Sequence, residues 1–290
     1  MKTVVVGAGA WGTAFATVLR ACDHETTVAT RATIDEAPYE EAELVAVAVP
    51  SRAFREVLTH VRGDAPVLIL TKGLDPVGGD RLSTLVRDRP VAVLSGPNMA
   101  EEVEDWLPAA TVIGCEDEGL AEWLQQALTS PLFRVYVNTD LIGVELCGAA
   151  KNVIALACGA VDGLRLGDNA KAALITRGLV EMARLGEACG AEPATFAGLA
   201  GLGDLVVTCW HPSGRNRRAG ELIAQGMSPE DAVAEIGHVV EGLTTAPVLR
   251  DLAHRLGIEM PITEGVCEVL SGTPIHELAA SLMVRPPVQE

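Results

Sequence analysis

The sequence predicts an α/β domain, built on a doubly wound parallel sheet, that is followed by an all-α domain. In the first half, seven short apolar and β-branched runs begin at Thr3, Thr26, Leu44, Val67, Val91, Ala110 and Phe133. Most of these runs are continuously apolar rather than alternating, which is typical of parallel strands covered on both faces. From about Leu141 onward there are no clear strands. We therefore expect a first domain over residues 1–140 and a helical second domain over residues 141–290.

Helical patterns lie between several of the predicted strands and fill the second half. Those of the first half cover residues 13–21, 53–62 and 118–128, and the alternation of strand and helix indicates a doubly wound sheet. In the second half, the helix over residues 173–189 ends at Gly190, a residue suited to a left-handed helix end. Further helices are expected from Pro229, Thr245, Ile262 and Pro274.

Composition and charge exclude several classes of protein. The net charge of −17, the isoelectric point near 4.7 and the aromatic content of 3% argue against a nucleic-acid surface. An anionic ligand would need a local basic pocket. The seven cysteines form no C-x-x-C pair and are interpreted as reduced core residues. The chain opens on a strand, and no apolar run reaches the ~18 residues of a membrane span, so we expect a cytoplasmic protein without membrane insertion.

A glycine-rich turn follows the first predicted strand and precedes the first predicted helix. Gly7 permits a tight turn, Gly9 lets a pyrophosphate approach the backbone, and Gly12 lets helix and strand pack closely. A helix that starts here also presents free N–H groups to an anion. The alternative is a turn that binds nothing. We favour a Rossmann-like dinucleotide site with contacts from Gly7, Gly9, Ala10, Trp11 and Gly12.

The second predicted strand ends at Thr30-Arg31, where an NAD-specific site usually places a carboxylate for the ribose hydroxyls. Arg31 could instead bind a 2′-phosphate, which favours NADP(H) with NAD(H) as the alternative; it could equally be a surface arginine. Only 12 residues separate Arg31 from the Leu44 strand. This is about the minimum for a parallel crossover, so we expect no helix there.

Lysine is scarce in this chain. Only Lys2, Lys72, Lys151 and Lys171 are lysine, and the other 18 of the 22 basic residues are arginine. A lysine inside the apolar run around residue 151 therefore indicates a need for a compact, titratable ammonium. The alternative is a side chain that reaches solvent from a helix edge.

Several longer strings resemble the bacterial type of NAD(P)-dependent glycerol-3-phosphate dehydrogenase. They are GAGAWGTAFA from Gly7, VPS from Val49, TKGL from Thr71, SGPNMAEEV from Ser95, GVELCGAAKNVIALACGAVDGLRLGDNAKAALITRG from Gly143, TFAGLAGLGDLVVTC from Thr195, SGRNRRAGE from Ser213, VVEGLTTA from Val239 and MPITEGV from Met260. They cover nearly the whole chain in the family's order. The chain departs from the family where the helix after the second strand is missing, on the adenosine side of the cofactor.

The resemblance implies reversible reduction of dihydroxyacetone phosphate by NAD(P)H to sn-glycerol 3-phosphate, which supplies glycerophospholipid synthesis. It implies that Lys151 is the proton donor and acceptor, that Asp204 positions Lys151 and holds a substrate hydroxyl, and that Lys72 orients the substrate beside the nicotinamide. Ketone reduction needs such a proton donor at the carbonyl oxygen. Burial near another cation should lower the pKa of Lys151. Asp204 could alternatively be a helix cap or a surface carboxylate.

The remaining site residues are assigned by the same resemblance. Substrate contacts are expected from Lys72, Gly96, Asn98, Asn152, Asp204, Thr208, Gly214, Arg215 and Asn216. Arg215 and Asn216 would bind the phosphate at a helix start, although SGRNRR could be an ordinary basic loop. Asn98 stands where relatives more often have serine. Cofactor contacts are further expected from Pro50, Lys72, Ala100, Arg215, Val239 and Glu241, the last at the nicotinamide carboxamide.

Two rival functions stay open from the sequence. One is a related dehydrogenase that acts on a carboxylate substrate, and the other is a non-catalytic dinucleotide sensor. His211 lies in a loop before Pro212 and is not expected to be the general acid. The histidines are spread without ligand spacing, so no metal is expected. The apolar helices of the second half are suited to a homodimer.

Overall fold

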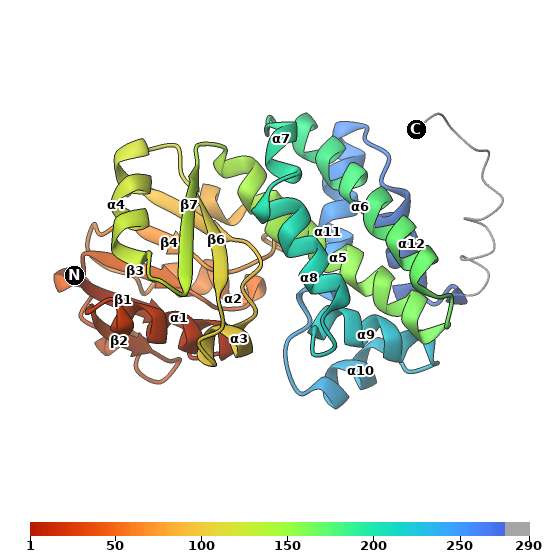
Figure 1. Cartoon of the computed structure of the whole chain (residues 1–290), viewed down its shortest axis with the longest axis horizontal. Helices are drawn as coiled ribbons and strands as arrows, with labels where there is room; N and C mark the ends of the chain where they lie inside the picture. The colour runs from red at the N-terminus through yellow and green to blue at the C-terminus, as the bar shows by residue number, and fades with distance from the viewer. Residues whose placement is uncertain (276–290) are drawn as a thin grey trace.

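A computed structural model describes residues 1–275 of the chain, and Figure 1 shows a sheet-containing half followed by a helical half. The sheet has seven strands: β1 (Lys2–Val6), β2 (Glu25–Ala29), β3 (Leu44–Val47), β4 (Val67–Ile69), β5 (Val91–Ser95), β6 (Ala109–Gly114) and β7 (Phe133–Asn138). Their order across the sheet is β2-β1-β3-β4-β5-β6-β7. The predicted Rossmann-like domain followed by a helical domain is confirmed.

One pair of strands departs from the expected parallel sheet. β5 and β6 are antiparallel, with Ser95 opposite Val112, whereas every other pair is parallel. The connection between them contains only the five-residue helix α3 (Ala100–Glu104). Such a helix rises only about 7 Å, less than the length of a five-residue strand, so the chain re-enters the sheet from the edge where β5 ended.

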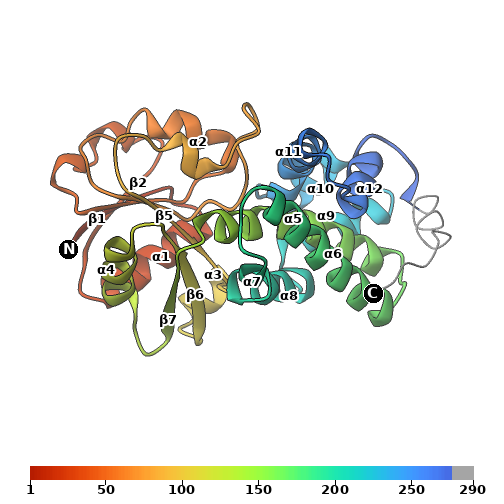
Figure 2. The same cartoon turned by 90° about the horizontal axis from the view of Figure 1, so that it is seen from above.

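Helices and irregular segments cover both faces of the sheet (Figure 2). One face carries α1 (Ala10–Ala21), α3 and α4 (Glu118–Leu128), which pack on alternate strand residues such as Val5 and Leu68. The other face carries α2 (Ser51–Leu58), the 3₁₀ turns η1 (Ile34–Glu36), η2 (Tyr39–Glu41) and η3 (Leu82–Leu85), and the first part of α5 (Leu141–Gly163). The inner strands are therefore buried on both sides, as their continuous apolar runs predict, whereas the edge strands β2 and β7 keep exposed residues.

The connection from β2 to β3 is as short as expected. It contains η1 and η2 and no α-helix. Ile34 and Tyr39 are buried against the sheet, so two apolar side chains do the covering that a crossover helix does elsewhere. Arg31 lies at the start of this connection and is exposed.

After β7, the part of the chain that the structure describes is entirely helical. The helices are α5, α6 (Asp168–Ala188), α7 (Pro193–Phe196), the π-helical turn η4 (Leu199–Gly203), α8 (Asp204–Trp210), α9 (Arg215–Ala224), α10 (Pro229–Ile236), α11 (Glu241–Leu256) and α12 (Pro261–Leu270). The helix predicted from Pro274 falls almost entirely on residues outside the described range.

Helix α5 is the structural centre of the second half. It contacts the helices α6, α8, α9, α11 and α12, and it also contacts the strands β5 and β6. Two segments, α5 and Pro193–Trp210, are each long and apolar enough to cross a membrane by length and composition alone. From the sequence we expected no run of that length. However, 89% of the most apolar window of α5 is buried inside the fold, which is how a core helix passes the same test.

Candidate active site

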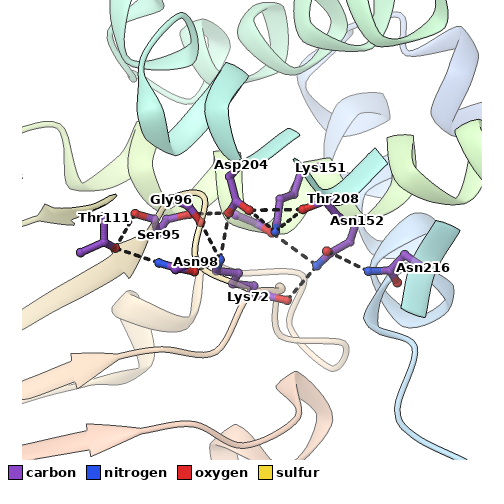
Figure 3. Close-up of polar contacts among 11 residues, drawn as sticks. Lys72, Ser95, Gly96, Asn98, Thr111, Lys151, Asn152, Asp204, Thr208 and Asn216 are labelled. Atoms are coloured by element: carbon purple, nitrogen blue, oxygen red, sulfur yellow. Dashed lines mark hydrogen bonds and ion pairs between the residues drawn. The ribbon is translucent and has the colours of Figure 1, made fainter. Parts of the chain in front are cut away.

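The predicted catalytic residues meet where the sheet touches α5 and α8. Lys72 follows β4, and Gly96 and Asn98 follow β5, so all three lie at the carboxyl edge of parallel strands. Lys151 and Asn152 come from the middle of α5, whereas Asp204 and Thr208 lie one turn apart on α8. Figure 3 shows these side chains pointing toward one another, linked by hydrogen bonds and ion pairs.

Asp204 is the centre of the cluster. Its side chain is buried and lies between two lysines: Lys151 Nζ donates to Oδ1 at 2.5 Å and Lys72 Nζ donates to Oδ2 at 2.9 Å. Thr208 Oγ1 donates to Oδ1 at 3.2 Å and accepts from Lys151 Nζ at 2.8 Å. Asp204 is the first residue of α8 and follows the π-helical turn η4, an irregularity common at functional sites. It is not the N-cap of α8, a position that Gly203 occupies, and it is not a surface carboxylate.

The electrostatics of the cluster tune Lys151. Burial lowers the pKa of Lys151 from its ordinary 10.5 to about 8, the Asp204 carboxylate opposes this shift, and the charge of Lys72 adds to it. This is the direction expected from a buried lysine beside a second cation. A lysine with a pKa of about 8 can both give and take a proton near neutral pH.

Asp204 itself remains ionised. Burial acts to raise the pKa of its carboxyl group, but the charges and hydrogen bonds of Lys151 and Lys72 together outweigh burial, and the pKa lies below the ordinary value. One carboxylate between two ammonium groups leaves a local positive charge in a protein whose net charge is −17. The cluster is thus a local positive site suited to an anionic ligand.

Lys72 is held from three sides. Besides Asp204, its Nζ donates to Asn98 Oδ1 at 3.0 Å and to Gly96 O at 3.3 Å. Gly148 of α5 lies against this region: a Cβ at this position would be tight against Ser95 Oγ, at 3.0 Å, and in ordinary contact with Lys72 Cγ, at 3.5 Å. The small residues of α5 therefore allow the helix to lie directly against the Lys72 side chain.

A chain of amides joins the second domain to the loop that carries Lys72. Asn216 Oδ1 accepts from Gly242 N at 2.8 Å, and Asn216 Nδ2 donates to Asn152 Oδ1 at 2.9 Å. Asn152 Nδ2 then donates to the backbone carbonyl of Lys72 at 3.2 Å. The neighbouring residues Gly214 and Arg215 begin α9. The helix start expected to bind phosphate is thereby tied to the lysine cluster.

The expected cofactor contacts gather at helix starts beside this cluster. Gly9 precedes α1 with no side chain capping the helix, and no protein atom would lie within 4 Å of a Cβ at Gly9. Its backbone is therefore open to an anion, and Ala10, Trp11 and Gly12 form the first turn. Pro50 precedes α2, and Ala100 begins α3. These features fit a bound dinucleotide.

Glu241 connects the cofactor edge to the second domain. It begins α11 and accepts from Ser51 N at 3.2 Å and from Ser51 Oγ at 2.7 Å. Burial raises the pKa of its carboxyl group despite these hydrogen bonds. Arg215 Nη1 donates to the nearby Val239 O at 3.2 Å. The residues expected at the nicotinamide end are thus brought together.

Other predicted or weighed residues lie apart from the lysine cluster. Arg31 is exposed beyond the end of β2, outside the lysine cluster. His211 lies outside the cluster, with its Nδ1 2.9 Å from Ser213 Oγ and its Nε2 3.6 Å from Glu102 Oε1. Among residues 1–275, no group of His, Cys, Asp or Glu could hold a metal ion.

Sequence reasoning missed three polar residues of the site. Ser51 contacts Glu241, Ser95 Oγ donates to Asp204 Oδ2 at 3.3 Å, and Thr111 accepts from Asn98 Nδ2 at 2.9 Å. Ser51 and Ser95 lie where parallel strands end, a position that could have marked them. Thr111 lies inside a strand and carried no such signal.

Comparisons with known proteins agree with this geometry. Models of the NAD-dependent glycerol-3-phosphate dehydrogenase N-terminus and C-terminus match residues 25–121 and 140–279. The chain is 49% identical to glycerol-3-phosphate dehydrogenase [NAD(P)+] of Symbiobacterium thermophilum, over 88% of this chain and 78% of that protein. It is 43% identical to the enzyme of the same name from Moorella thermoacetica, over 99% and 96%.

A solved structure resembles the whole chain. The crystal structure of glycerol-3-phosphate dehydrogenase from Coxiella burnetii has a TM-score of 0.92 and 36% identity to this chain, covering 98% of this chain and 99% of that one. The chain therefore belongs to the NAD-dependent glycerol-3-phosphate dehydrogenase family.

Proposed function

We propose that this chain catalyses the reversible NAD(P)H-dependent reduction of dihydroxyacetone phosphate to sn-glycerol 3-phosphate. The observation that carries the proposal is the Lys72–Asp204–Lys151 cluster, in which Asp204 and Lys151 are buried and Lys72 is half-buried. Hydrogen bonds through Asn152 and Asn216 link it to the helix start at Arg215. A ketone placed there would meet a proton donor on one side and phosphate-binding groups on the other.

In this proposal Lys151 acts on the ketone oxygen. A dihydronicotinamide held at the dinucleotide site would supply the hydride for the carbonyl carbon. The Lys151 ammonium polarises the oxygen and gives it a proton, so that an alcohol forms and a neutral amine remains, which solvent protonates again. Asp204 holds Lys151 in place and accepts from a substrate hydroxyl, and Lys72 orients the substrate.

The phosphate end is assigned to the start of α9. Arg215 offers a planar guanidinium fork, and the free N–H groups of the first turn after Gly214 add to it. Asn216 has both side-chain atoms engaged within the protein, so it would also order Asn152 and the Lys72 loop. Gly96, Asn98, Asn152 and Thr208 complete the substrate site in this assignment.

The remaining assignments follow from the two halves of the chain. Residues 1–140 would bind the dinucleotide through Gly7, Gly9, Ala10, Trp11 and Gly12, with NADP(H) favoured because Arg31 replaces a carboxylate. Residues 141–290 would hold the substrate. We place the enzyme in the cytoplasm as a homodimer, running toward the precursor of glycerophospholipids.

The test is oxidation of NADPH and NADH by the purified protein with dihydroxyacetone phosphate. Dihydroxyacetone without phosphate, oxaloacetate and ketopantoate serve as comparison substrates. The proposal predicts turnover with the phosphate ester and at most about 1% of that rate with the others, because each lacks the phosphate that Arg215 would bind. Preferred turnover of a carboxylate substrate would replace this function with that of the rival dehydrogenase.

A further inference from the structure

We infer that Thr111 is a positioning residue that fixes the amide of Asn98 and, through it, the ammonium group of Lys72. The inference rests on the proposed function, in which Lys72 orients the substrate. Thr111 has 0% of its surface exposed and lies on β6, so it acts through Asn98 without touching substrate. Figure 3 shows the three side chains in line, with Asn98 between Thr111 and Lys72.

The direction of each hydrogen bond in this line is determined by chemistry. Thr111 Oγ1 donates its only proton to the carbonyl of Ser95 at 3.0 Å, because that carbonyl can only accept. The oxygen of Thr111 therefore turns a lone pair toward Asn98, and Asn98 must present its Nδ2 there, at 2.9 Å. The Asn98 Oδ1 is left facing Lys72 Nζ at 3.0 Å.

Without the Thr111 hydroxyl, Asn98 Nδ2 would lose its acceptor in the sheet, and only the Lys72 ammonium would favour the observed orientation of the Asn98 amide. Its oxygen and nitrogen have nearly the same shape, so a flipped amide would turn two N–H donors toward the Lys72 ammonium, which is itself only a donor. In the observed arrangement the three N–H groups of Lys72 have three acceptors, on Gly96, Asn98 and Asp204. Thr111 thus protects one of the three contacts that aim Lys72 into the site.

The reversed direction of β6 brings Thr111 to this position. Ser95 at the end of β5 is opposite Val112, so the amino-terminal half of β6 lies beside the carboxyl end of β5. The turn after β5 packs directly against Thr111, because a Cβ at Gly96 would be only 2.9 Å from Thr111 Cα. If β6 ran parallel to β5, Thr111 would lie beside the amino end of β5, away from Asn98 and Lys72.

The first test compares two substitutions at Thr111 with a matched control. Thr111→Val keeps the shape and removes the hydroxyl, and we expect kcat with dihydroxyacetone phosphate to fall about tenfold while the KM for NADPH stays unchanged. Thr111→Ser retains the hydroxyl and should restore most of the activity. Thr3→Val is the control: Thr3 is equally buried in the sheet, and within the described chain its hydroxyl has no hydrogen-bond partner.

The second test separates positioning from general packing. In an Asn98→Ala background Thr111→Val should have almost no further effect on kcat, because the link is already absent. The double variant also lacks the buried amide that the single valine variant leaves unpaired, so it stays informative if the single variant fails to fold. Equal losses in both backgrounds, or no rescue by serine, would contradict the inference.

A readout that does not need turnover distinguishes this inference from the proposed function. The chain has only four lysines, so ¹⁵N-lysine labelling gives four ammonium signals. Thr111→Val should speed solvent exchange of the Lys72 ammonium several-fold and leave those of Lys2 and Lys171 unchanged. If the wild-type protein reduced no phosphate ester, the proposed function would fail, while an unchanged Lys72 signal would overturn the role of Thr111.

Discussion

The two ends of the proposed active site are built differently. Around Asp204, each lysine ammonium is hydrogen-bonded on several sides, and helices of the second domain cover the cluster. Beyond β2, two 3₁₀ turns replace a crossover helix, and Arg31 is exposed. Under the proposed function, the geometry of proton transfer would therefore be closely specified, whereas the adenosine end of the cofactor site would depend on a few surface contacts.

The largest effect is expected at Lys151. Replacing Lys151 with Ala should lower kcat by about 10³–10⁴-fold, because the proton donor is removed, and should leave NADPH affinity unchanged. Steady-state kinetics and a fluorescence titration of NADPH measure the two quantities. Lys171→Met is the matched control, since Lys171 is an equally buried lysine of the helical domain that pairs with Asp162. Retained turnover in Lys151→Ala would remove Lys151 from the mechanism.

A smaller effect is expected at Asp204. Asp204→Asn should lower kcat by about 10²-fold, because the carboxylate that positions both lysines loses its charge. The carboxylate raises the pKa of Lys151, so its removal should move that pKa below about 8. The pH dependence of kcat for reduction should therefore shift toward acid in the variant. A shift toward alkaline pH, in protein with a normal unfolding transition, would contradict the coupling.

The smallest effect is expected on the cofactor side. Arg31→Ser should raise the KM for NADPH about fivefold and leave the KM for NADH unchanged, as expected for a single exposed ion pair with a 2′-phosphate. Arg134→Ser is the control, because Arg134 is an exposed arginine on β7, at the opposite edge of the sheet from β2. If the KM for NADPH does not change, Arg31 does not select the cofactor.

Most of the fold could be predicted from the sequence, because buried strands have recognisable apolar runs. Apolar and β-branched runs, most of them continuous, marked all seven strands, and the short spacing after Arg31 predicted the missing helix. The direction of β6 could not be predicted in this way, because its run AATVIG is apolar whether the strand pairs parallel or antiparallel. Direction depends on how far the preceding connection can travel, and the five-residue helix α3 became evident only in the structure.

The same limit explains which site residues were missed. Lys72, Lys151 and Asp204 stand in strings distinctive enough to recognise, and Lys151 is also conspicuous as a rare lysine in an apolar helix. Thr111 is one threonine in an ordinary strand, and its partner Asn98 precedes it by 13 residues across a turn. Its role depends on hydrogen-bond direction between antiparallel strands, which no spacing in the sequence encodes.

The most direct test of the lysine cluster is the pH dependence of kcat/KM in both directions, because kcat/KM reports the pKa values of the free enzyme. Reduction needs the Lys151 ammonium, so its rate should be constant below a pH of about 8 and fall tenfold per unit above it; oxidation needs the free amine and should rise toward the same pH. Measurements from pH 6 to pH 10 on the wild type, with the ketone or alcohol substrate well below its KM, provide both curves. Mirror-image curves crossing near pH 8 are the predicted result, and a reduction rate that stays flat through pH 10 would contradict the account.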